Sequence, residues 1–331
     1  MKLRGKLPPN LLKEEILEKL PTQGKGVILG PALGEDAAII DVGNGTIAIH
    51  SDPVTGGGEL AGWLSVYVAS NDIATRGVKP DWLLTVFLFR ENISKEEIRE
   101  IVNQVGEAAK QIDAVVVGGH TEVTPSLPFN IVVTTALGLS KGKILNTRDA
   151  KEGDKLIVTK AVGLEGTAIL ATELEDELKK KGVAKSTLIN SQGFIREISI
   201  VKEALISKDI ANSMHDPTEG GLIGGVQEMA LASGHGFRIY EDRVPIRKET
   251  LEICRALGID PLKLISSGSL LISVRNERAT ELVNLLKSKG VNASIIGELT
   301  PEAEGMKLVR KDGSEDDLSM PVVDELWRVL D

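Results

Sequence analysis

Segments typical of strands alternate with segments typical of helices along the whole chain, and this pattern restarts near residue 150. In the first half, strand-like apolar runs occur at 37–42, 46–50, 82–89, 113–117 and 129–138. Helical patterns precede and separate them at 10–20, 60–75 and 94–111, the last beginning with a capping box of Ser94 and Glu97. Gly118 and Gly119 predict a break between the strands at 113–117 and 129–138.

The second half repeats this alternation after the connection at 140–153, which is rich in Lys and Gly. Strand-like runs lie at 155–160, 237–240, 269–274 and 292–297, and helical patterns at 165–206, 220–233, 248–257 and 277–289. The sequence therefore predicts two α/β halves of similar size, 1–150 and 151–331, which agrees with roughly 150 residues per domain.

Composition excludes several classes of protein. Hydrophobic residues make up 42% and charged residues 26% of the 331 positions, as in soluble globular proteins. A net charge of −9, scattered basic residues and 10 aromatic residues (5 Phe, 3 Trp and 2 Tyr) argue against a nucleic-acid surface. Nucleotides are still possible ligands, because backbone amides and metal ions can hold an anion on an acidic protein.

The single cysteine, Cys254, excludes an intrachain disulfide and a cysteine-rich zinc site. It lies on the apolar stripe of the 248–257 helical pattern, which favours a buried side chain over a reactive thiol. No apolar run reaches the roughly 18 residues of a membrane span, and no apolar signal core follows the first residues. We therefore expect no membrane partner and a cytoplasmic location.

Two acidic segments near the start combine glycine with a following apolar strand or helix. Glu35 and Asp36 precede the strand at 37–42, where a turn with two solvated acids is an equally good interpretation. Asp52 follows the strand at 46–50, and three glycines, 56–58, then lead into a helix. A glycine-rich loop before a helix can cradle phosphate, although it can also be a flexible loop, and no Walker motif is present.

The helix predicted at 60–75 continues its apolar face with polar residues. Asn71 lies seven residues after Leu64 and Asp72 four residues after Val68, so both extend the buried stripe. A buried carboxylate costs several kcal/mol unless it has a partner, a metal ion or a shifted pKa. The structural alternative is a salt bridge at the helix end with Arg76.

Two later segments join glycines to polar residues. His120 follows Gly118 and Gly119, and a histidine there is more often a hydrogen-bonding turn residue than a catalyst. In the segment 215–221, Asp216 can be the N-cap of the next helix, with Glu219 as its capping-box partner. That interpretation leaves unexplained the glycines that follow, which indicate close approach to a ligand or another element: Gly220, Gly221, Gly224 and Gly225.

Carboxylates and glycine turns therefore recur without a cluster of cysteine or histidine. Such a set of residues suits a hard cation with oxygen ligands, namely magnesium, holding phosphates. The residues alone predict a magnesium–nucleotide site and nothing finer.

Taken in order, five motifs resemble a known superfamily. It comprises aminoimidazole ribonucleotide (AIR) synthetase, the hydrogenase-maturation dehydratase HypE, selenophosphate synthetase and thiamine-monophosphate kinase. The resemblance extends from about Gly5 to Glu298, and the segments 5–9 and 265–271 look most like the HypE branch. The motifs are Gly34–Ala38, Ser51–Asp52, Asn71–Pro80, Gly118–Thr121 and His215–Leu222.

The resemblance implies an α/β (α+β) fold of two domains. The N-terminal mixed-sheet domain would dimerise through its sheet, and a C-terminal α/β domain would follow. ATP would lie between them, held by Mg. By motif, the implied metal ligands are Asp36, Asp52, Asp72 and Asp216, and the implied nucleotide-binding residues are Asp52, Asn71, Gly118, Gly119, His120, Thr121, Gly220 and Gly221. Asp72 and His120 are the implied catalytic residues.

The implied activity uses the γ-phosphate of ATP to activate an acceptor, here an unidentified small molecule or protein group. The chain departs from the HypE pattern, because it ends at 326–331 without the cysteine that carries the carbamoyl group, so dehydration on such a thiol is not expected. It has no cysteine near Gly5, unlike selenophosphate synthetases, and His120 stands where Asp is usual in the dehydratases and kinases. The alternatives are a non-catalytic nucleotide-binding maturation partner and a phosphotransferase like thiamine-monophosphate kinase.

Overall fold

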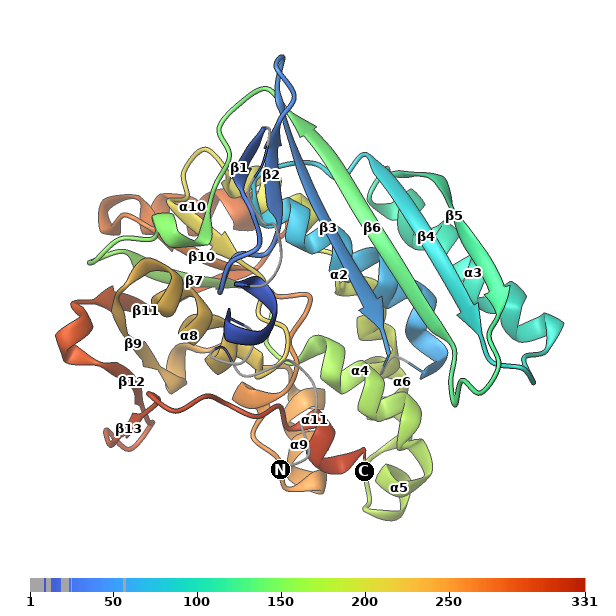
Figure 1. The fold of residues 1–331 in the computed structure, drawn as a ribbon. Coiled ribbons are helices and arrows are strands. Elements are labelled where there is room, and N and C mark those ends of the chain that lie inside the picture. The colour runs from blue at the N-terminus through green and yellow to red at the C-terminus, as the bar shows by residue number, and fades with distance from the viewer. Residues whose placement is uncertain (1–8, 10–12, 19–23, 25, 56–57, 331) are drawn as a thin grey trace.

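The computed structural model describes the chain except for residues 1–8, 10–12, 19–23, 25, 56–57 and 331 (Figure 1). Of the helix predicted at 10–20, the described part is a π-helical turn, η1 (Lys13–Leu17). Two of the three glycines in the predicted phosphate cradle, Gly56 and Gly57, lie outside the described residues, as does Gly5.

Strands from the first half form a six-stranded mixed sheet in the order β1-β2-β3-β6-β4-β5. Its neighbours are antiparallel except β4 and β5, which run parallel. Figure 1 shows β5 at one edge of this sheet and β1 at the other. The strand bounds are β1 (Val27–Leu29), β2 (Ala38–Asp41), β3 (Thr46–Val54), β4 (Trp82–Phe89), β5 (Val115–Val123) and β6 (Ile131–Ser140).

Two strands differ from the sequence-based expectation. The strand expected to end at His50 continues as β3 through Pro53, paired with β6. Proline is tolerated there because the other neighbour, β2, pairs no further than Ile49 and leaves that side of β3 open. The break expected at Gly118 and Gly119 is absent, and β5 runs through both. A Cβ on Gly119 would lie 1.8 Å from a backbone oxygen of β4, so glycine permits this close approach beside a bulge.

Helix α2 (Ala61–Thr75) packs between the first sheet and the second half of the chain. It follows the short helix η2 (Gly58–Leu60), contacts β3 and β6 on one side and contacts α7 (Val201–Ser207) of the second half on another. All fifteen of its residues are buried, so it is not the one-faced amphipathic helix that the spacing predicted. The sheet's second helix, α3 (Lys95–Gln111), begins with the predicted capping box of Ser94 and Glu97.

Strands from the second half form a seven-stranded mixed sheet in the order β13-β12-β9-β11-β7-β10-β8. The strand bounds are β7 (Lys155–Thr159), β8 (Ser213–His215), β9 (Gly236–Tyr240), β10 (Leu271–Val274), β11 (Ala293–Thr300), β12 (Met306–Val309) and β13 (Glu315–Asp317). The α-helices are α4 (Leu164–Glu173), α5 (Glu175–Lys180), α6 (Lys185–Gln192), α7 (Val201–Ser207), α8 (Gly221–Ser233), α9 (Lys248–Leu257), α10 (Asn276–Ser288) and α11 (Leu326–Val329). Short 3₁₀ turns are η3 (Thr147–Asp149), η4 (Gly193–Glu197), η5 (Glu241–Arg243), η6 (Pro261–Lys263) and η7 (Glu302–Glu304).

The fold class is therefore the expected one, with two mixed sheets and helices packed against them. Cys254 is buried, and burial raises the pKa of its thiol to about 12, which fits a packing role rather than a reactive one. Within the described ranges, every helix is too short or too polar to cross a membrane.

Candidate functional site

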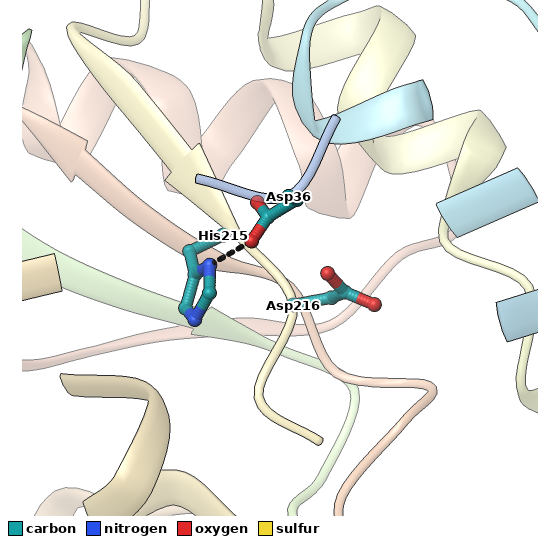
Figure 2. A group of neighbouring side chains, drawn as sticks. All are labelled: Asp36, His215 and Asp216. Carbon is teal, nitrogen blue, oxygen red and sulfur yellow. Dashed lines mark ion pairs between the residues drawn. The ribbon is translucent and has the colours of Figure 1, made fainter. Parts of the chain in front are cut away.

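Asp36, His215 and Asp216 converge from the two halves of the chain (Figure 2). Asp36 lies just before β2, whereas His215 ends β8 and Asp216 follows it directly. The Nδ1 atom of His215 lies 2.6 Å from Oδ1 of Asp36, and its Nε2 atom lies 2.9 Å from Oε2 of Glu228. The imidazole of His215 is thus held between the carboxylates of Asp36 and Glu228. The side chains of His215, Asp36 and Asp216 are shielded from solvent.

A second group joins β3 to helix α2. His50 and Asp52 are two residues apart on β3, so their side chains point to the same face of the sheet. Asp72 reaches them from α2, and its Oδ2 atom lies 3.0 Å from Nε2 of His50. Asp72 therefore forms an ion pair with His50, whereas Arg76 pairs with Glu35 and Asp36, so the expected alternative of a salt bridge between Asp72 and Arg76 is wrong.

The two groups form one acidic centre. The carboxyl of Asp216 lies against that of Asp72 and near Asp36. Burial, together with the negative charges of Asp72 and Asp36, raises the pKa of Asp216 well above its ordinary range. The structure thus brings together the four aspartates named as metal ligands, and we refer to Asp36, Asp52, Asp72 and Asp216 as the acidic centre.

Histidines supply positive charge beside these carboxylates. Burial opposes protonation of His50, but Asp72, Asp52 and Asp36 outweigh it and raise the pKa of His50 to about 9. Burial likewise opposes protonation of His215, while Asp36 and Glu228 raise its pKa well above the usual value. His50 is therefore imidazolium at neutral pH, and the surroundings of His215 likewise favour its charged form.

Arg76 anchors the segment that carries Asp36. This guanidinium is fully buried and lies 2.7 Å from Oε2 of Glu35 and 2.6 Å from Oδ2 of Asp36. Burial would raise the pKa of Asp36, but His215 and Arg76 together hold it well below its ordinary range. Glu35 also accepts a hydrogen bond from Nε of Arg148 at 2.7 Å. Glu35 and Asp36 are therefore both paired and buried, and the interpretation of them as two solvated acids is wrong.

The acidic centre fits a hard divalent cation. Its donors are carboxylate oxygens, the ligands that Mg²⁺ prefers. Among the residues that the structure describes, Oδ2 of Asp216 has no hydrogen-bond partner although it is buried. A buried, unpartnered carboxylate oxygen facing other carboxylates is costly without a cation, so binding of Mg²⁺ here would remove an existing penalty.

Asn71 has a structural position one residue before Asp72. Its amide nitrogen donates to the carbonyl of Ile198 at 3.1 Å, and its amide oxygen accepts from the N–H of Ile200 at 2.9 Å. Both bonds cross from α2 to the segment between η4 and α7, so Asn71 ties the two halves together beside the acidic centre.

The predicted phosphate-binding run Gly118–Thr121 lies elsewhere in this chain. It is on β5, three strands from β3, which corresponds to about 14 Å at the usual strand spacing. His120 is exposed, and its Nε2 atom lies 3.1 Å from Oε2 of Glu122. A single copy of the chain therefore does not bring His120 to the acidic centre.

The loop after Asp216 is shaped by its glycines. Helix α8 begins at Gly221 with Gly220 as its N-cap, so the capping-box interpretation of Asp216 and Glu219 is wrong. Both glycines have positive φ, and a Cβ on Gly221 would lie 2.6 Å from the carbonyl oxygen of Leu264. The close approach predicted from these glycines is thus to another element of the protein.

Glu165, which the sequence analysis did not single out, is a buried carboxyl near the acidic centre. It lies at the start of α4, and its Oε2 atom is without a hydrogen-bond partner in the described part of the chain. Burial raises the pKa of Glu165 to about 7, reinforced by the charges of Asp324 and Asp52 and opposed by the neighbouring Ser267. Glu165 stands in the sequence Gly-Leu-Glu-Gly at the start of a helix, and no spacing of neighbouring residues there indicates that its carboxyl is buried.

Replacing Glu165 with Gln should stabilise the fold above neutral pH. Because its folded-state pKa is raised from 4.5 to about 7, the wild-type chain loses stability as pH rises through that interval, by about 3 kcal/mol in full. Gln cannot ionise, so urea unfolding at pH 5 and pH 8.5 should show a smaller loss for Glu165→Gln. The exposed Glu96→Gln serves as the control, and equal losses in all three proteins would contradict this assignment.

Family models for AIR synthase related proteins match both halves of the chain. The model of the N-terminal domain matches residues 34–140, and the model of the C-terminal domain matches residues 151–308. The matched ranges contain all four aspartates of the acidic centre.

Individual proteins are similar over most of the chain. A hydrogenase expression/formation protein of Methanocaldococcus jannaschii is 31% identical, covering 98% of this chain and 97% of its own. The carbamoyl dehydratase HypE of Bradyrhizobium diazoefficiens is 27% identical, covering 81% of this chain and 78% of its own. The crystal structure of a hydrogenase maturation protein HypE in complex with ATP has the same fold, with a TM-score of 0.72, 22% identity and coverage of 96% and 95%.

Proposed function

The chain belongs to the AIR synthase related family, with HypE-like hydrogenase maturation proteins among its relatives, and we propose that it is an ATP- and Mg²⁺-dependent enzyme. It would use the γ-phosphate of ATP to activate an acceptor group in a HypE-like maturation reaction. The observation that carries this proposal is the acidic centre, where four aspartates from both halves converge and one buried oxygen of Asp216 has no hydrogen-bond partner among the described residues.

Within this proposal, Asp36, Asp52, Asp72 and Asp216 hold Mg²⁺, which supplies charge neutralisation and alignment for the phosphates of ATP. His50 and His215 fix the orientation of the carboxylates they contact, at 3.0 Å from Asp72 and 2.6 Å from Asp36. Burial of the carboxylates keeps water from competing for these contacts. The protein's contribution to phosphoryl transfer is then positioning and electrostatics, as in other phosphotransferases.

The exposed sheet edge supports a homodimer as part of the proposal. All nine residues of β5 are exposed, although this edge strand carries Val115, Val116, Val117 and Val123. A long apolar edge strand is a surface that proteins usually cover. A second copy packed on the sheet would cover this strand and bring Gly118–Thr121 of the partner toward the acidic centre.

The proposed homodimer predicts the mass of the protein in solution. Light scattering should give twice the 35.5 kDa mass of one chain.

The proposal is tested by calorimetric titration of the protein with ATP, once with Mg²⁺ and once with a chelator. Binding that requires Mg²⁺ is the expected result, since the acidic centre repels the phosphates of free ATP. Equal binding in both conditions would contradict the assigned role of the carboxylates. Turnover of bound ATP in the presence of cell extract would separate an enzyme from a nucleotide-binding partner protein without activity.

A further inference from the structure

Three strand ends of the second sheet meet beside the segment that connects the two halves of the chain. In register, Lys155 of β7 is opposite Val274 of β10, and Ser213 of β8 is opposite Ser273, so the start of β7, the start of β8 and the end of β10 share one edge. The segment that leads from β6 to β7 passes this edge (green in Figure 1). A cavity of about 460 Å³ opens there, lined by Lys143, Arg148, Asp149, Ala150, Lys151, Asn212 and Arg275.

The lining of this cavity is strongly basic in an otherwise acidic protein. It carries four cationic side chains and one carboxylate, against a net charge of −9 for the whole chain. Across the ranges the structure covers, Lys143, Lys151 and Arg275 form no ion pair, and the carboxylate of Asp149 instead accepts from the side-chain amide of Asn146 at 2.8 Å. Glu35, which pairs with Arg148, and Asp149 offset part of the positive charge, and the ammonium of Lys143 donates to the carbonyl of Ala211 at 3.0 Å. The remaining repulsion among the cations would be relieved by an anion.

Arg148 is held in a fixed orientation at the wall of the cavity. Its Nε atom donates to Oε1 of the buried Glu35 at 2.7 Å, while about half of its side chain is exposed. Its two terminal nitrogens make no hydrogen bond within the described parts of the chain. An arginine fixed through Nε and open at its terminal nitrogens is pre-organised for bidentate contact with an oxyanion.

A buried carboxylate beside the cavity holds two of its lining residues. The buried carboxylate of Asp154 accepts from the backbone N–H of Lys151 at 3.0 Å, from the side-chain amide of Asn212 at 2.9 Å and from the hydroxyl of Ser273 at 2.5 Å. These bonds tie Lys151 and Asn212, two residues of the lining, to the ends of the three strands.

We propose that this cavity binds a phosphate group carried by a small molecule. Cations from two chain segments line it, the connection at 140–153 and Arg275 after β10, and its volume of about 460 Å³ exceeds the needs of a single phosphate ion. The site is distinct from the acidic centre, whose carboxylates disfavour a free anion, and it does not depend on the proposed function.

The test is a calorimetric titration of the metal-free protein with glycerol 3-phosphate and with orthophosphate, in chelator and low salt. The expected dissociation constant for the monoester is below about 1 mM. The double variant Lys143→Ala/Arg275→Ala should weaken binding at least about tenfold, because each lost cation removes a charge-assisted contact. Lys180→Ala/Lys287→Ala removes the same charge from exposed sites on α5 and α10 and should change binding less than about twofold.

Binding of the monoester that is lost in the cavity variant and kept in the matched variant supports the site. Tighter binding of the monoester than of orthophosphate supports a phosphate carried on a larger molecule, whereas equal or weaker binding overturns that part in favour of the free ion. Absence of binding up to 10 mM of either probe (about ten times the expected constant), or equal loss in both double variants, would overturn the site itself.

Discussion

Asp72→Asn should abolish Mg²⁺-dependent ATP binding while the protein remains folded. Asp72 contacts His50 at 3.0 Å and lies against Asp216, so it belongs to both groups of the acidic centre. Removing its charge should lower the affinity for ATP in Mg²⁺ by at least about thirtyfold, since losing one partner of a buried charge contact costs about 2–5 kcal/mol. Calorimetric titration with ATP and Mg²⁺ measures this directly.

The same substitution should leave the metal-free protein folded, because loss of the contact with His50 is offset by a second effect. The charge of Asp72 raises the pKa of Asp216, so Asn at position 72 relieves a repulsion. The thermal midpoint without Mg²⁺ therefore distinguishes loss of a ligand from loss of the fold. Asp209→Asn, at an exposed position, should change neither quantity, and an unchanged ATP affinity in Asp72→Asn would remove the acidic centre from the proposed function.

Local sequence patterns were sufficient for many elements of the fold. β4 has the predicted bounds 82–89, and α3 begins with the predicted capping box, because both are specified by neighbouring residues. β4 is nevertheless not buried throughout, since Trp82 and Leu84 are each 40% exposed. Which face of a strand is open depends on what covers the sheet, and the pattern of one strand does not contain that information.

Tertiary contacts explain the elements that the sequence did not predict. α2 is buried on every side because it lies between the first sheet and α7, and β5 continues through Gly119 because β4 approaches it there. The strands β8, β12 and β13 are each three or four residues long, which is too short to show the alternation of apolar and polar residues that predicts a strand. Their pairing depends on partners that lie far away in sequence.

The sequence predicted the carboxylates of the candidate site but not the side chains that contact them. Motifs named the four aspartates that the structure brings together, whereas His50 and His215 were not singled out as site residues. His50 is two residues before Asp52 on a strand, and this alternation was a usable signal for a shared face. His215 precedes Asp216 directly, and its contact with Asp36 depends on the packing of the two halves, which no spacing reveals.

Arg76→Met should destabilise the protein more than any other single change considered for this chain. The guanidinium is fully buried and lies 2.7 Å from Glu35 and 2.6 Å from Asp36, and it also donates to the hydroxyl of Thr147 at 2.9 Å. Loss of one partner from a buried ionic cluster costs about 3–5 kcal/mol, because Glu35 and Asp36 stay buried with one fewer positive partner each. Equilibrium urea unfolding at pH 7 measures the effect, and Arg278→Ala on the surface of α10 should be indistinguishable from wild type.

Adding Glu35→Gln to Arg76→Met should restore part of the lost stability, because it removes a buried carboxylate that has lost Arg76 and keeps only its contact with the half-exposed Arg148. Asp36 keeps its contact with His215 at 2.6 Å in that double variant, so the restoration would come from Glu35. Arg76→Lys should fall between wild type and Arg76→Met, since an ammonium keeps the charge but cannot reach both carboxylates in the geometry of a planar fork. If Arg76→Met unfolds at the wild-type urea concentration, the buried cluster does not hold Asp36 in place, and the orientation of the acidic centre must come from His215 alone.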